Sequence, residues 1–188
     1  MWRLLLVLSV LPIVAALIAR WYFGMRVLAG DGVRACRCDL GKWLPLPDDD
    51  AVIHRAEESA AEFGRQLRLK AMAEWRETEP KAASARESSR RFGMAVPPLS
   101  AMVAVMALIV AKIPIVGCIA LVLAATALAS VLGVLSMAPE MAAITRAAKK
   151  LRETKSFPRR DDEDAVIRCA VAHAWKESLP PILGLLQR

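Results

Sequence analysis

Residues on which many enzymes and secreted scaffolds depend are scarce in this chain. Its 188 residues include four cysteines, two histidines and 5% aromatic residues. Because His54 and His173 are the only imidazole bases, neither a Ser-His-Asp triad nor a Cys-His pair can be assembled, and no phosphate-cradling glycine loop occurs. The sequence therefore has no complete catalytic signature.

The four cysteines have neither the C-x-x-C spacing of a zinc ribbon nor the density of a disulfide scaffold. They are Cys36, Cys38, Cys118 and Cys169. We expect them to be reduced thiols. The basic residues around the C-x-C pair Cys36-Arg37-Cys38 are of the kind that lowers a thiol pKa, but two cysteines alone make at most half a metal site.

Charge is also missing over long stretches, although 24% of the residues are charged and 56% are hydrophobic. Residues 92–137 contain one charged side chain, that of Lys112. As a helix this run is about 69 Å long, twice the roughly 30 Å of a hydrocarbon core. We therefore predict two membrane spans, at residues 92–111 and 115–138, that turn at Lys112-Ile113-Pro114. Pro97-Pro98 is predicted to begin or to bend the first of these two helices.

A further apolar segment, residues 4–23, is long enough to span a membrane. It lacks a small-x-small cleavage site and ends in Trp21-Tyr22-Phe23, which suits a membrane interface, so we expect an anchor and not a cleaved signal peptide. The predicted parts are an N-terminal transmembrane anchor (1–28), a cytoplasmic loop (29–91) with an amphipathic helix at about 50–78, a transmembrane hairpin (92–138), and a cytoplasmic basic segment with a C-terminal interfacial or transmembrane helix (139–188).

Basic residues set the expected orientation. They follow the first and third spans in number, while the hairpin tip holds only Lys112. The positive-inside rule then places the central loop in the cytoplasm of a multi-pass protein of the inner (plasma) membrane. The net charge of +7 is explained by this orientation, so we expect contact with the lipid bilayer and no nucleic acid. Small residues at four-residue spacing, Ala125, Ala129 and Gly133, would also allow a homo-oligomer through the membrane helices.

The loop helix carries the candidate site. His54, Glu58 and Glu62 follow one another at four-residue spacing, so on a helix all three project from one face. Such nitrogen and oxygen ligands resemble half of a helical zinc site, with Glu58 as the catalytic residue if the protein is active. The alternative is a solvated face on which Glu58 and Glu62 pair with arginines one turn away.

The order of features resembles that of the neutral zinc metallopeptidase family of small bacterial membrane proteins, over residues 51–188. The similarity is strongest in Ser136–Leu151, SMAPEMAAITRAAKKL, where the family has Leu-Pro-Val-Glu-Phe-x-Ala-Ser-Arg-Arg-Ala after a span. Pro139, Arg146 and Ala148 match. The closing alanine-rich segment AVIRCAVAHAWKESLPPILGLLQR is similar to the last helix of that family.

The resemblance implies an H-E-x-x-H zinc helix, which this chain does not retain. Aligned with the motif, Glu58 matches the glutamate, but Glu57 and Ala61 stand where the two histidines should be. The downstream acidic ligand falls at Met141, or at Glu140 after a one-residue slip. The chain thus resembles a degenerate member, a pseudoenzyme that keeps the membrane scaffold without the metal ligands.

The predicted fold class is all-α, with three transmembrane helices, a fourth C-terminal helix and a cytoplasmic amphipathic helix. The leading hypothesis is a non-catalytic integral membrane protein without a cofactor, which acts through the membrane or a protein partner. One alternative is an active zinc-dependent peptidase with a non-standard ligand set drawn from His54, Glu58, Glu62 and Glu140 or His173. The other is a structural membrane protein whose loop helix lies on the lipid surface.

Overall fold

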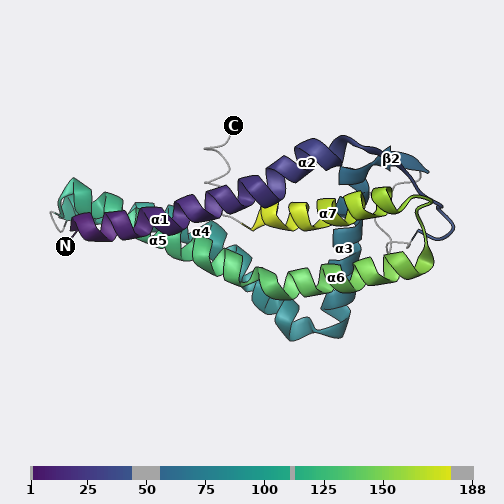
Figure 1. Ribbon diagram of the computed structural model, residues 1–188. Coiled ribbons are helices and arrows are strands. Elements are labelled where there is room, and N and C mark those ends of the chain that lie inside the picture. Colours follow the sequence, from purple (N-terminus) through teal and green to yellow (C-terminus); the bar gives the residue numbers. More distant parts are fainter. Residues whose placement is uncertain (1, 44–55, 111–112, 179–188) are drawn as a thin grey trace. The chain divides into compact units, whose positions relative to one another are not determined.

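The computed structural model describes residues 2–43, 56–110 and 113–178, and these are mostly helical (Figure 1). The all-α prediction is confirmed, with one small addition, a two-stranded antiparallel ribbon. The elements are α1 (Trp2–Arg20), η1 (Trp21–Met25, π-helical), α2 (Arg26–Gly30), η2 (Asp31–Val33, 3-10), β1 (Ala35–Arg37), β2 (Glu57–Ser59), α3 (Ala60–Thr78), α4 (Pro80–Val110), α5 (Ile115–Leu135), α6 (Met137–Thr154) and α7 (Arg160–Glu177).

The chain divides into two compact units. We call the first the apolar unit; it comprises the described residues of Met1–Arg20, Ala85–Met137 and Glu177–Arg188. The second, the polar unit, comprises those of Trp21–Ser84 and Ala138–Lys176. The polar unit is therefore built from two chain segments, one on each side of the α4–α5 hairpin in sequence.

Most of the apolar length of the three predicted hydrophobic stretches belongs to the apolar unit. Three helical runs, Leu4–Val33, Pro80–Val110 and Ile115–Thr154, are long and apolar enough to cross a membrane. Much of their apolar surface is uncovered by protein, with Leu4 67% and Ile109 69% exposed. Inside the unit, Ile13 of α1 packs on Ala127 of α5. Water would disfavour so much exposed hydrocarbon, whereas lipid would not.

The hairpin differs from its prediction in its boundaries. α4 begins at Pro80, a favourable first helical position, so the helix starts well before residue 92 and runs through Pro97 and Pro98. Ser84 lies inside α4 and donates its hydroxyl to the Lys81 carbonyl. α5 begins at Ile115 as predicted, with Pro114 as its N-cap, and ends at Leu135.

The polar unit has an aromatic centre. The rings of Trp43, Phe63 and Phe157 meet edge to face, with centroids 5.0 to 5.5 Å apart. All three side chains are buried, and the Trp43 indole N–H donates to the Gln66 side-chain oxygen over 3.3 Å. Edge-to-face contacts add to the stabilisation that burial provides. The cluster joins the loop after β1, helix α3 and the link between α6 and α7.

Two predicted helices are corrected by the structure. The amphipathic helix ends at Thr78 as expected but begins at Ala60, not near residue 50, because residues 57–59 pair with β1 and Ser59 provides the N-cap. The C-terminal helix, predicted to be interfacial or transmembrane, runs from Arg160 to Glu177, and protein covers its apolar face. Its small apolar side chains lie in the interior of the polar unit; Ala165, Val166, Cys169, Ala170 and Ala172 are all fully buried.

Gly64 sets how closely α3 approaches α7. A Cβ atom at this position would lie 2.6 Å from the Cys169 Cβ and 2.8 Å from the Ala170 amide nitrogen. Real side chains do not approach so closely, and the Ala170 contact is with backbone that cannot rotate away. Gly64 therefore lowers the helix propensity of α3 but allows α3 and α7 to pack closely.

We predict that Gly64→Ala lowers the melting temperature. Overpacking costs about 1–3 kcal/mol, which exceeds the gain of up to about 1 kcal/mol in helix propensity. Thermal unfolding of the detergent-purified chain, followed by circular dichroism, measures the effect. Gly30→Ala is the matched control, since a Cβ there meets nothing within 4 Å; equal melting temperatures for both variants would contradict the close approach.

Candidate functional site

Two of the candidate metal residues, Glu58 and Glu62, lie on either side of the junction between β2 and α3. Ser59 ends the strand and caps the helix, because its hydroxyl accepts from the Glu62 amide over 3.3 Å. Glu58 turns back on the junction and accepts from the Ser59 amide over 3.2 Å. Glu62 receives the Arg65 guanidinium one turn later, with the Arg65 Nε 3.0 Å from one carboxylate oxygen.

This arrangement removes the geometric basis of the predicted site. Glu58 lies in β2 and Glu62 in the first turn of α3, so the two do not share a helical face. The expected pairing of Glu62 with Arg65 is present. His54 lies outside the described residues. The error in the prediction came from extending the helical period across residues that form a strand.

The segment aligned with the zinc helix of the metallopeptidases also straddles this junction. Glu57 and Glu58 belong to the strand, whereas Ala61 is in the helix. The Ala61 carbonyl lies 3.0 Å from the His173 Nε2 of α7, so His173 contacts backbone at the position aligned with the second motif histidine. Within the described ranges, no three His, Cys, Asp or Glu side chains gather as a metal site.

Glu140, which the expected acidic ligand reaches only after a one-residue slip from Met141, forms an ion pair with Arg68. The Nε and Nη2 of Arg68 both lie 2.8 Å from the Glu140 Oε1. The glutamate side chain is 1% exposed and the arginine side chain 11% exposed. A carboxylate that already compensates a buried guanidinium is committed to structure, because withdrawing it would leave an uncompensated charge.

Carboxylates at the start of α7 also have basic partners in the polar unit. The Asp162 carboxylate lies 2.8 Å from the Arg34 guanidinium, and that of Asp164 accepts from Arg152 over 2.9 Å. Farther along α7, Arg168 donates to Asp31 over 2.7 Å. These pairs connect α7 to η2, to the residue before β1 and to α6.

The three thiols of the polar unit are buried, and their pKa values are raised above the ordinary value. Burial raises the pKa of Cys36 and of Cys38 to about 11 each, and that of Cys169 to about 12. The lowered pKa expected for the C-x-C pair is therefore wrong. The Arg34 charge does lower the Cys36 pKa, but desolvation and the Asp162 carboxylate outweigh it.

Comparison of the chain with protein-family models, with curated proteins and with solved structures finds no match.

We predict that Arg68→Ala lowers the free energy of unfolding by about 3–5 kcal/mol, because it leaves the Glu140 carboxylate buried without its guanidinium. Urea unfolding of the detergent-purified chain, followed by circular dichroism, measures this. The double variant Arg68→Met/Glu140→Met should recover most of the loss, since neither charge is then buried. Arg65→Ala is the control, because its partly exposed pair with Glu62 is worth at most about 1 kcal/mol; an equal loss there would contradict the special role of the buried pair.

Proposed function

We propose that the protein is a non-catalytic integral membrane protein, in which three spanning helices hold a compact helical unit at one membrane surface. That unit acts by binding, through its surface, rather than by hydrolysis. The zinc metallopeptidase architecture would be its structural relative, with the metal ligands replaced. The observation that carries this proposal is the commitment of Glu140, the acidic residue next to the aligned Met141, to the buried ion pair with Arg68.

Membrane integration is supported by the length, composition and exposure of the apolar helices. A helix of about 20 apolar residues spans a hydrocarbon core, and each of the three runs exceeds that length. Aromatic side chains at the end of the predicted span 4–23, Trp21, Tyr22 and Phe23, are about half exposed, as suits a headgroup region. The lipid bilayer is therefore the first partner that we propose.

Contacts within the polar unit support a hairpin that crosses the membrane twice. α3 precedes the α4–α5 hairpin and α6 follows it, yet Arg68 of α3 and Glu140 of α6 form a salt bridge. Lys150 of α6 likewise lies 2.7 Å from Glu74 of α3. Both segments must lie on the same side of a membrane for these pairs to form. Two crossings between them satisfy this requirement, and the basic flanks favour the cytoplasmic side.

The absence of catalysis is tested by metal content. We expect elemental mass spectrometry of the detergent-purified chain to find far less than one zinc per protein, with the same value for Glu58→Ala. The reason is that Glu58 is held at the β2–α3 junction and Glu140 by Arg68. Near-stoichiometric zinc that is lost in Glu58→Ala would overturn the proposal in favour of a peptidase with a non-standard ligand set.

The topology is tested separately with reporter fusions in a bacterial host. Alkaline phosphatase, which is active only after export, should be active when fused after Lys112 and inactive when fused after Thr154. A fluorescent protein that matures in the cytoplasm should give the reverse pattern at the same two positions. Active phosphatase after Thr154 would place the polar unit outside and contradict the orientation expected from the basic residues.

A further inference from the structure

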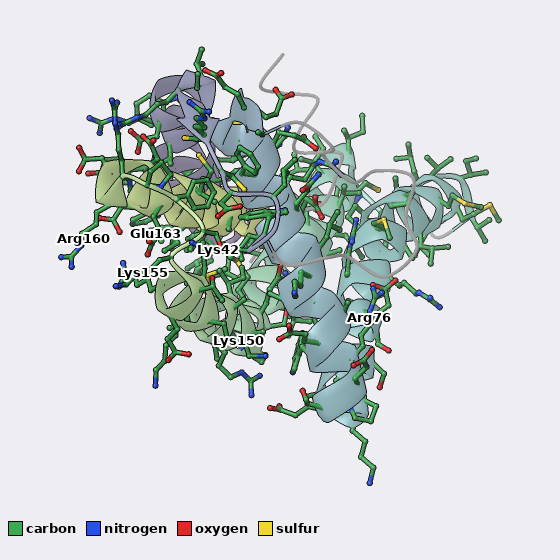
Figure 2. The ribbon with its side chains drawn as sticks, turned by 90° about the vertical axis from the view of Figure 1, so that its right-hand side faces the viewer. Lys42, Arg76, Lys150, Lys155, Arg160 and Glu163 are labelled. Atoms are coloured by element: carbon green, nitrogen blue, oxygen red, sulfur yellow. The ribbon has the colours of Figure 1, made fainter. Side chains whose placement is uncertain are left out.

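A cationic cavity lies on the polar unit, between the loop after β1 and the link from α6 to α7. Its volume is about 480 Å³. Three cations and one carboxylate are among the residues that line it: Arg37, Lys42, Lys155 and Asp39. Figure 2 shows Lys42 and Lys155 on the same part of the polar unit, although 113 positions separate them in sequence. The site is therefore assembled by the fold from separate segments.

Hydrogen bonds join the two walls of this cavity, which are the loop after β1 and the link between α6 and α7. The Asp39 amide donates to the Ser156 carbonyl over 2.9 Å, and the Ser156 hydroxyl donates to the Lys42 carbonyl over 2.9 Å. Beyond these bonds, Trp43 and Phe157 anchor both walls in the aromatic cluster. A ligand entering the cavity would thus meet a preformed backbone frame and would not have to order it, which favours affinity.

Lys155 occupies an unusual backbone position. It follows the last residue of α6 with a φ of 48°, in the left-handed region that commonly ends helices at glycine. A lysine there costs conformational energy that glycine would avoid. Strained non-glycine residues occur preferentially at functional sites, and here the strained residue supplies one of the cavity's three cations.

Charge and size together define the ligand. Asp39 lies 3.4 Å from the Lys42 ammonium and offsets one cation, so the lining residues retain an excess of two positive charges. Such a site favours a dianion, and arginine with lysine is the usual combination for phosphate. A cavity of about 480 Å³ falls within the range of small-molecule sites and leaves room for an organic group beside a phosphate.

We propose that this cavity binds a phosphate ester, whose phosphate lies among Arg37, Lys42 and Lys155 and whose organic group fills the remaining space. The ester has two natural sources, a free metabolite or the headgroup of an anionic phospholipid. The inference does not depend on the proposed lack of catalysis, because the site is separate from Glu58 and Glu140. Zinc content tests one proposal and ligand affinity the other.

Calorimetric titration of the detergent-purified full chain with glycerol 3-phosphate tests the proposal, with glycerol as the uncharged comparison. We expect saturable binding of the phosphate ester alone. Arg37→Gln and Lys42→Gln should each weaken it about tenfold or more, since each removes a charge-assisted contact. Lys149→Gln is the matched control, because this exposed lysine of α6 does not line the cavity, and it should change the affinity less than about twofold.

Lys155→Gly separates binding from stability. Glycine relieves the left-handed backbone, so the melting temperature should stay the same or rise, while the affinity for glycerol 3-phosphate falls about tenfold or more. If Lys155 acted only on the α6 C-terminus, the variant would change stability without changing affinity. That result, or no binding by the wild type, or affinities of all three cavity variants equal to that of the wild type, would overturn the proposal.

Lipid retention identifies the source of the ester. The chain is placed in nanodiscs of phosphatidylcholine with phosphatidic acid, whose headgroup is a phosphate monoester like glycerol 3-phosphate, then released and weighed by native mass spectrometry. Phosphatidic acid retained by the wild type and lost in Lys155→Gly would support a headgroup ligand. Glycerol 3-phosphate binding without retained lipid would support a free ester. If Lys149→Gln also lost the binding of glycerol 3-phosphate and of the lipid, the attraction would be a general effect of charge, which would contradict a defined site.

Discussion

The buried ion pair between Arg68 and Glu140 is the contact on which the polar unit depends. Removing two charges from water costs several kcal/mol for each, so the pair is tolerated only because each charge compensates the other. It joins residues 72 positions apart, on helices that the α4–α5 hairpin separates in sequence. The pair therefore brings together two chain segments of the polar unit that the apolar hairpin separates in sequence, and it holds the Glu140 carboxylate in a structural contact.

Local features of the fold were predictable from the sequence, whereas pairing between distant segments was not. α5 starts after Pro114, and α3 ends at Thr78, two residues before Pro80. A proline limits the helix that precedes it, and this effect acts within a few residues of the sequence. The start of α3 depends instead on β1, since Cys36 pairs with Glu58 across the ribbon. Nothing near Glu58 in the sequence indicates that partner. The helical face expected to hold Glu58 and Glu62 together is wrong for this reason, because the ribbon takes Glu58.

Helix α7 shows why composition alone misplaces a helix. Its alanines and its single histidine suggest a weakly amphipathic segment at a membrane surface, yet the small side chains serve close packing. Gly64 of α3 lies against the Cys169–Ala170 backbone, and a larger residue on either helix would separate them. Small residues allow close approach in lipid and in a protein interior alike. The pattern of small residues therefore predicts that another helix packs closely against α7, but not whether the contact lies in lipid or in a protein interior.

The basic residues after the third hydrophobic run have two physical roles that the sequence cannot separate. Their number fits the positive-inside rule, which counts lysines and arginines without regard to their exact positions. The exact position of Lys155 is not explained by membrane orientation. A lysine that served only the positive-inside rule could occupy any position in the last turns of α6, where the backbone is not left-handed. The fold places its charge beside Arg37 and Lys42 from the other wall of the cavity. Lys155 adopts an unfavourable backbone conformation in a cavity whose two sides are already joined by hydrogen bonds. Ligand binding explains this position better than membrane topology does.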